Sequence, residues 1–167
     1  MKRVCAWCLK EMGVVETSER PDTEISHGIC ENCLDNLTAQ SGMSFQHYLD
    51  SLPLPVFMVD GNVEVIAVNS RACAVLGKKN AELIHHLGGN VFECQYARLP
   101  LGCGRTIHCS GCTIRKAVTR TFETGEPLSM VPATLSHADP DLPTEISLYI
   151  TTAKVGDMIM LRVDKMV

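Results

Sequence analysis

The placement of its cysteines constrains the fold of this chain more than any other feature. The chain has nine cysteines in 167 residues, and eight of them form two groups of four. The first group is Cys5, Cys8, Cys30 and Cys33, the second is Cys94, Cys103, Cys109 and Cys112, and Cys73 stands alone. Any fold proposed for the chain must therefore account for two local concentrations of thiols.

The chain is expected to remain in the cytoplasm. No stretch approaches the ~20 apolar residues that cross a bilayer. The basic start Met1-Lys2-Arg3 is not followed by the apolar segment of a secretion signal. Structural disulfides are rare in the reducing cytosol. Metal binding is therefore the first explanation for the thiols.

The first group consists of two CxxC pairs separated by 21 residues. A CxxC turn presents two thiolates to one ion, and zinc prefers four such ligands in a tetrahedron. The spacing slightly exceeds the usual range, which a longer ribbon hairpin accommodates. No βαβ pattern surrounds either pair, and Leu9 and Leu34 stand where haem attachment requires histidine. We predict a structural zinc site, with His27 as a poorer ligand candidate.

The second group lies in residues 94–112, a loop rich in cysteine and glycine with no hydrophobic period. Its glycines let the backbone wrap closely around a ligand, as amide-to-sulfur hydrogen bonds require. Three interpretations remain open: an iron–sulfur cluster, a second zinc site, or free thiols with Cys109 and Cys112 as the exchanging pair. His108 is an alternative ligand in place of Cys94. Cys73 is expected to pack in the core as a small apolar side chain.

The hydrophobic pattern after residue 40 predicts an antiparallel sheet with helices on one face. Residues 38–44 are small and polar and indicate a linker, and an amphipathic helix follows over residues 45–52. Two apolar runs around Asp60-Gly61-Asn62 predict a hairpin. Short helices follow, one of them over residues 81–87 and ended by Gly88-Gly89, and three strand-like runs close the chain. The fold class is therefore α+β, with a zinc ribbon over residues 1–40 and a five-stranded antiparallel sheet with short helices on one face over residues 41–167.

Charge and motifs exclude several classes of function. The net charge is −4, and residues 1–40 hold 4 Lys and Arg against 7 Asp and Glu, whereas phosphate contacts need clustered Lys and Arg. The sequence contains no Ser-His-Asp order, P-loop or dinucleotide glycine motif. We therefore expect no nucleic-acid partner, no membrane partner and no enzymatic activity.

Several segments resemble a PAS domain. The run 54–61, leading to Val68-Asn69-Ser70-Arg71-Ala72, resembles the start of such a domain, and residues 122–127 resemble the stretch between its long helix and its third strand. The resemblance covers about residues 45–165. The CxxC pairs resemble short zinc ribbons found beside bacterial signalling domains. The central cluster resembles cysteine-rich PAS variants associated with iron–sulfur clusters, although its spacing differs. The resemblance implies a sensor that holds a ligand or cofactor between sheet and helices and alters a contact with a partner protein.

Together these features predict a cytoplasmic signal-sensing or adaptor protein. The ribbon would hold zinc, the PAS domain would sense redox state, oxygen or a small ligand, and the output would be a contact with a signalling partner. The helix over residues 45–52 is a candidate homodimer surface. The alternatives are a structural zinc-binding interaction module without sensing and a thiol–disulfide redox protein that uses Cys109 and Cys112.

Overall fold

A computed structural model of the chain describes residues 2–5, 8–14, 25–34, 44–141 and 143–167. These residues divide into two compact units, Met1–Tyr48 and Leu49–Val167. The predicted linker, residues 38–44, lies outside the described residues except for Ser44. No helix in the described ranges is long and apolar enough to span a membrane.

The first unit is built on a small three-stranded sheet in the order β2-β1-β3. Strand β1 (Lys2–Cys5) pairs antiparallel with β2 (Glu11–Val14) and parallel with β3 (Ile25–Gly28). The turn between β1 and β2 closes with the Cys5 amide donating to the Lys10 carbonyl at 2.9 Å. Leu9 has a φ of 57° in this turn, a left-handed conformation that follows directly on Cys8. Residues 31–34 are helical.

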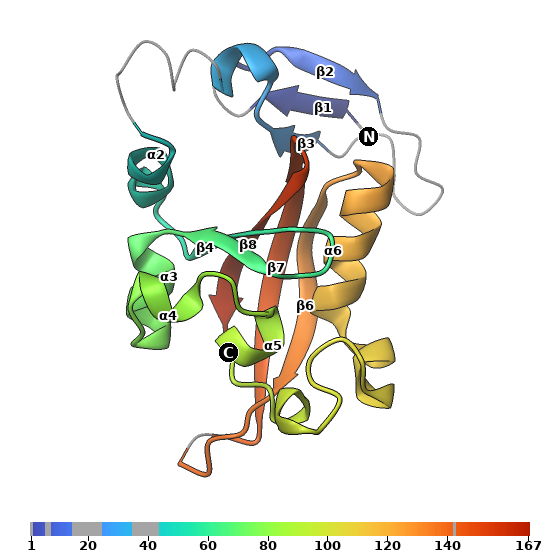
Figure 1. Ribbon diagram of the computed structural model, residues 1–167. Helices are drawn as coiled ribbons and strands as arrows, with labels where there is room; N and C mark the ends of the chain where they lie inside the picture. Colours follow the sequence, from blue (N-terminus) through green and yellow to red (C-terminus); the bar gives the residue numbers. More distant parts are fainter. Residues whose placement is uncertain (1, 6–7, 15–24, 35–43, 142) are drawn as a thin grey trace. The chain divides into compact units, whose positions relative to one another are not determined.

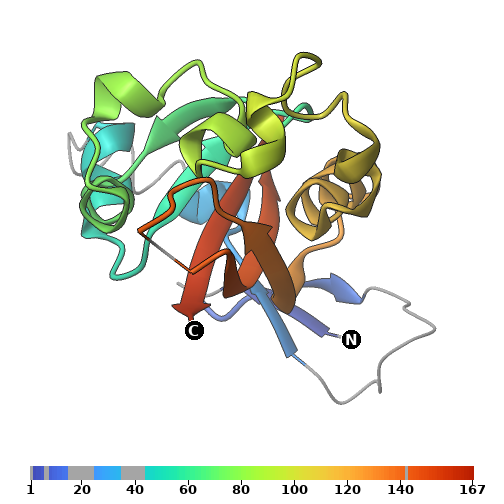
Figure 2. The same cartoon turned by 90° about the horizontal axis from the view of Figure 1, so that it is seen from below.

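The second unit is a five-stranded antiparallel sheet in the order β5-β4-β8-β7-β6 (Figures 1 and 2). Its strands are β4 (Val56–Val59), β5 (Val65–Val68), β6 (Leu128–Ser136), β7 (Glu145–Val155) and β8 (Met158–Met166). Its helices are the end of α2 (Phe45–Ser51), then α3 (Ser70–Leu76), α4 (Asn80–Leu83), α5 (Gly88–Val91) and α6 (Thr113–Thr124), with two 3-10 turns, η1 (Gln95–Arg98) and η2 (Ile107–Gly111), between α5 and α6. The α+β prediction is confirmed.

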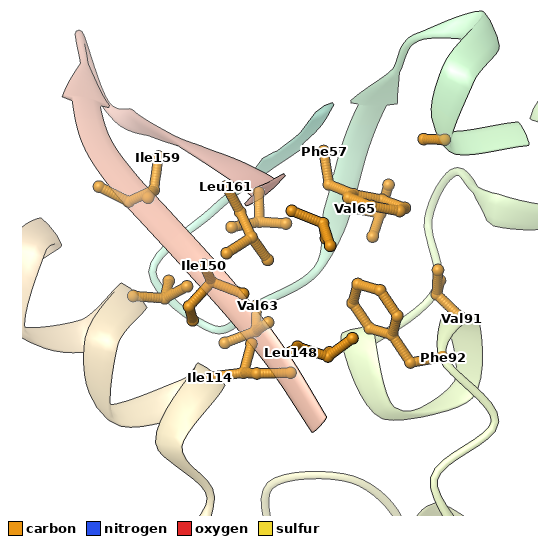
Figure 3. Close-up of a cluster of buried hydrophobic side chains, with 14 of the residues drawn as sticks. Phe57, Val63, Val65, Val91, Phe92, Ile114, Leu148, Ile150, Ile159 and Leu161 are labelled. Carbon is orange, nitrogen blue, oxygen red and sulfur yellow. The ribbon is translucent and has the colours of Figure 1, made fainter. Parts of the chain in front are cut away.

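Helix α6 packs along β6, β7 and β8, while α3 lies beside β4 and α4 beside β5 (Figure 1). The core between helices and sheet is apolar, and Figure 3 shows Phe57, Leu161 and Phe92 pointing toward one another from β4, β8 and the end of α5. The Phe57 and Phe92 rings lie 4.9 Å apart at 55°, a tilted aromatic contact. The loop that carries the central cysteines therefore begins and ends on elements anchored in this core.

Asn69 fixes the first part of the second unit. Its side chain is fully buried, and its Oδ1 accepts hydrogen bonds from the Ala72 amide at 2.9 Å and the Val56 amide at 3.0 Å. Its Nδ2 donates to the Leu49 carbonyl at 3.1 Å and to the Leu54 carbonyl at 2.8 Å. One amide thus caps α3, pairs with β4 and holds the end of α2.

Candidate metal centre and cysteine-lined pocket

The four amino-terminal cysteines meet at one point in the first unit. The sulfur atoms of Cys5, Cys8, Cys30 and Cys33 all lie within 4.8 Å of one another. The Cys8 and Cys30 sulfurs are 3.8 Å apart. A tetrahedral zinc with Zn–S bonds of about 2.3 Å requires sulfur–sulfur edges of about 3.8 Å. The four thiols therefore fit a single tetrahedral ion.

The parallel pairing of β1 with β3 brings the two CxxC pairs together. Cys5 ends β1 opposite Gly28 of β3, and Cys30 follows two residues later. The Cys30 amide then donates to the Cys5 sulfur at 3.5 Å. In the second pair, the Cys33 amide donates to the Cys30 carbonyl at 3.0 Å, which curls the chain so that both sulfurs face the same side.

Crowding by the neighbouring sulfurs opposes the ionisation of Cys33. The neighbouring Cys8 and Cys30 sulfurs raise the pKa of Cys33 to about 12, and burial adds to the effect. Four thiolates at this separation repel one another, and a divalent cation in their midst would remove that repulsion. The donor set and its geometry thus both suit zinc.

The four central cysteines line one small cavity in the second unit. Cys94, Cys103, Cys109 and Cys112 border a cavity of about 50 Å³, together with apolar side chains that include Val63, Phe92, Ile114 and Leu135. All four cysteines are partly buried. Cys94 precedes η1, Cys109 lies in η2, and Cys112 is the N-cap of α6. In the described part of the chain, only the amino-terminal quartet has three or more such ligand atoms gathered as closely as 4.8 Å. The central sulfurs surround a space instead of converging on a point.

Hydrogen-bond donors point at two of the central sulfurs. The Gly104 amide donates to the Cys109 sulfur at 3.0 Å, and the Thr106 hydroxyl lies 3.2 Å from the same sulfur. The Gly89 amide donates to the Cys103 sulfur at 3.3 Å, and the Arg115 guanidinium donates to it at 3.7 Å. Donors in these positions stabilise negative charge on sulfur.

The same surroundings set the thiol pKa values apart. Burial raises the pKa of Cys94, and the nearby Cys112 and Cys103 add to the effect. Burial also acts to raise the pKa of Cys109, but the hydrogen bonds from Thr106 and Gly104 and the charge of Arg115 outweigh it, so that this pKa lies below its usual value. Cys109 therefore becomes a thiolate more readily than Cys94 does.

Glycine at position 89 allows the chain to pass directly over Cys103. A Cβ at this position would lie 2.7 Å from the Cys103 sulfur and 2.9 Å from its Cβ. Gly104 has a φ of 85°, a conformation that L side chains rarely adopt. These two glycines deliver backbone amides to the Cys103 and Cys109 sulfurs.

The remaining predicted site residues lie at the edge of the cavity or apart from it. His108 borders the cavity but is exposed, and its ring stacks on Tyr96 with centroids 4.0 Å apart. Cys73 lies in α3, half-buried and packed against the core, and burial raises the pKa of its thiol. The side chain of His27 lies outside the described residues.

Sequence reasoning did not single out Gly89, Thr106 or Arg115. The position of Arg115, three residues after Cys112 at the start of a helix, places it on the same face as that cysteine and was the one available signal. Thr106 and Gly89 reach their sulfurs only through the fold of the loop.

A second, larger cavity lies beside the first. It measures about 270 Å³ and is bordered by apolar residues of the sheet, α3 and α5, with Lys78, Glu93, His137 and Asp139 as its polar wall. Lys78 binds the Glu93 carboxylate at 2.8 Å. Phe92 and Leu135 border both cavities.

Comparison with known proteins bears on the fold of the second unit. Residues 43–108 match the family described as PAS domain. A domain of the sensory box sensor histidine kinase/response regulator from Geobacter sulfurreducens is 17% identical with a TM-score of 0.53, covering 78% of this chain and 98% of that domain. The photoactive yellow protein domain of the sensor histidine kinase Ppr from Rhodospirillum centenum is 18% identical with a TM-score of 0.46, covering 74% of this chain and 95% of that domain. No curated protein matches the chain in sequence. Residues 43–108 thus resemble the PAS family in sequence, the second unit has the PAS fold, and the first unit is a small β unit with a four-cysteine cluster.

Proposed function

We propose that this protein is a cytoplasmic PAS sensor whose central cysteines hold an iron–sulfur cluster and whose amino-terminal unit is stabilised by zinc. The signal is redox state or oxygen, and the output is a changed contact with a signalling protein. One observation carries the proposal: four cysteines from separate parts of a loop line a single cavity of the PAS unit, and amide donors point at their sulfurs.

The cavity favours a cluster over a second zinc ion. A single zinc ion needs four sulfurs as close together as those of the first unit, which lie within 4.8 Å of one another. The four central cysteines instead line a cavity. A cluster presents several iron atoms to its ligands and needs such a space. When bound, it supplies reversible one-electron chemistry.

The surrounding residues have defined parts in this proposal. Cys94, Cys103, Cys109 and Cys112 hold the cluster. The Gly89 and Gly104 amides and the Arg115 guanidinium stabilise the negative charge of the sulfurs and set the potential at which an electron is taken up. The apolar wall formed by Val63, Phe92 and Leu135 limits the access of water.

The amino-terminal unit is proposed to hold zinc through Cys5, Cys8, Cys30 and Cys33. Its β1 and β2 strands have four residues each and bury few apolar side chains, since Cys5 is the one fully buried residue among them. A structural zinc is worth about 10–16 kcal/mol in zinc-finger peptides, which suffices to fold a unit of this size. Its surface is available as a docking surface.

Signalling is favoured by the match to the PAS family and by the Geobacter domain, which belongs to a sensor histidine kinase/response regulator. The output would run through a partner protein or through a homodimer formed at α2, without a catalytic step. Part of that helix is covered within the chain, because Leu49 is fully buried. A homodimer would use its remaining exposed face.

A small organic ligand is the second candidate signal. The cavity of about 270 Å³ has an apolar lining and a polar wall, as small-molecule sites commonly do. Such a ligand would be sensed without a change of redox state.

Metal analysis of protein purified without oxygen tests the proposal. We expect one zinc together with several irons per chain, and a brown colour with absorbance near ~400 nm. Replacing Cys109 with serine should remove the iron and leave the zinc, whereas the matched Cys73→Ser variant should keep both. Two colourless zinc ions per chain would favour the structural zinc module. One zinc with two reactive thiols at Cys109 and Cys112 would favour a thiol–disulfide protein.

A further inference from the structure

The outer surface of the cysteine loop differs in charge from the rest of the protein. Between Glu93 and Glu123 the sequence has no acidic residue but has five basic ones, Arg98, Arg105, Arg115, Lys116 and Arg120. The rest of the chain contains the other 10 Lys and Arg together with all 19 Asp and Glu. The cysteine loop and the helix α6 that follows it thus form a basic segment of an acidic protein.

The same loop exposes large apolar side chains. Ile107 is 84% exposed, Leu101 64% and Leu99 42%. Arg98 and Arg105 of the loop are exposed as well, and so is Lys116 in the first turn of α6. We name these six residues the loop surface. Basic and apolar groups side by side in sequence are typical of a site that binds an acidic partner.

The loop surface is held in shape by its own backbone. The Gly102 amide donates to the Leu99 carbonyl at 2.8 Å, and the Cys109 amide donates to the Thr106 carbonyl at 3.0 Å. The Ser110 hydroxyl donates to the Ile107 carbonyl at 2.7 Å. A partner would therefore meet groups that are already ordered, which lowers the entropic cost of binding.

Side chains along this loop alternate between the surface and the sulfur site. Arg105 and Ile107 are exposed, while Thr106 between them is 8% exposed and its hydroxyl lies 3.2 Å from the Cys109 sulfur. Leu101 is exposed, and Cys103 two residues later turns inward to the Gly89 amide. The outer side of the loop surface and the inner side that contacts sulfur are thus the two faces of one short backbone.

We propose that the loop surface is the docking site of a small acidic electron-carrier protein. This inference rests on the proposed function, because it assigns a reductant to the cysteine site. In each encounter the carrier loses one electron and the cofactor held by the four cysteines gains it, and no bond or proton changes place. Charge complementarity would speed the encounter, and the exposed Ile107 and Leu101 would supply apolar contact at its centre.

Binding to flavodoxin, an acidic one-electron carrier, tests the docking site directly. The variant Arg98→Glu, Arg105→Glu, Lys116→Glu reverses the loop surface. The control Arg71→Glu, Lys79→Glu, Lys165→Glu makes the same change of net charge at three exposed residues outside the loop. Isothermal titration at about 20 mM salt should show affinity at least about 10-fold weaker for the loop variant and within about 2-fold of wild type for the control. Salt at about 500 mM should abolish the difference.

Reduction kinetics complete the test. Reduced flavodoxin should reduce the loop variant about 10-fold more slowly than the wild type and the control, while dithionite reduces all three alike. Equal binding and equal flavodoxin rates in all three proteins would overturn the docking site and leave the sensor intact. Failure of dithionite itself, or absence of iron, would instead overturn the proposed function. A wild-type dimer that dissociates in the loop variant would assign the loop surface to a second copy of the chain, and so would also refute the proposal.

Discussion

Replacing Gly89 with alanine is the sharpest test of the central site. The added Cβ would lie 2.7 Å from the Cys103 sulfur, whereas ordinary contacts are 3.4–4 Å. The sulfur must therefore retreat by roughly 1 Å, and overpacking of this kind costs about 1–3 kcal/mol. Gly89 lies in α5, where alanine has a higher helix propensity than glycine, so helix propensity alone predicts that the substitution stabilises the protein.

The expected loss is about 3–9 °C in thermal unfolding for a unit of this size. Displacement of Cys103 also breaks its hydrogen bond from the Gly89 amide, and loss of such a supporting contact typically lowers metal affinity 10–100-fold. Circular dichroism melts and iron and zinc contents of protein prepared without oxygen measure both effects. Zinc should stay at the wild-type level.

Gly111→Ala is the matched control, because a Cβ at Gly111 meets nothing within 4 Å and the residue lies in the loop that carries Cys103. It should melt and bind iron like the wild type. If Gly89→Ala also melted within about 1 °C of the wild type and kept its full iron, the close contact between α5 and Cys103 would be wrong, and with it the proposed cavity.

Three further predictions concern other parts of the chain. Asn69→Ala removes four hydrogen bonds of a fully buried side chain and should lower the free energy of unfolding by about 3 kcal/mol or more. Asn69→Asp keeps the acceptor but sets a buried oxygen against the Leu49 and Leu54 carbonyls, so it should be at least as destabilising; a urea melt that leaves either variant within about 1 kcal/mol of the wild type contradicts the role of this side chain. Cys8→Ser should remove zinc while iron and the main unfolding transition stay unchanged, as mass spectrometry and calorimetry would record; retention of zinc would refute the quartet. Burial, with the charge of Asp50, raises the pKa of the Cys73 thiol. The contribution of Cys73 to stability is therefore complete below its unfolded pKa of about 8.5 and is lost as the pH rises through its folded pKa. The difference in unfolding free energy between wild type and Cys73→Ala should shrink from pH ~8 to ~10, and a constant difference would contradict this pKa shift.

Local chemistry explains which parts of the fold were predictable. The hairpin at Asp60-Gly61-Asn62 was readable because it depends on neighbours in sequence: the Asp60 carboxylate accepts from the Asn62 amide at 2.8 Å and the Glu64 amide at 2.9 Å. The alternation of apolar residues in β7 and β8 likewise follows from one buried face.

The helix predicted over residues 81–87 is confirmed over residues 81–83 and is too long for a tertiary reason. Helix α4 ends at Leu83, and Gly88-Gly89 begins α5 instead of ending a helix. A Cβ at Gly88 would lie 2.9 Å from a methyl carbon of Val63, and one at Gly89 would meet Cys103. These two glycines allow segments that are distant in sequence to pack closely against α5. No pattern of neighbouring residues in the sequence reveals such a contact. The grouping of the cysteines could be read from spacing, but the donors to their sulfurs could not.

The wall between the two cavities has a consequence for how signals combine. Phe92 and Leu135 border both spaces, and Cys94 follows Phe92 by two residues. A ligand that enlarges the larger cavity must move Phe92 and Leu135 toward the cysteine-lined cavity. If the cysteine site holds the proposed redox cofactor, any preference of a ligand in the larger cavity for one oxidation state is matched, by thermodynamic linkage, by an equal shift in the cofactor's potential. The signalling output would then depend both on ligand occupancy of the larger cavity and on the oxidation state of the cysteine site.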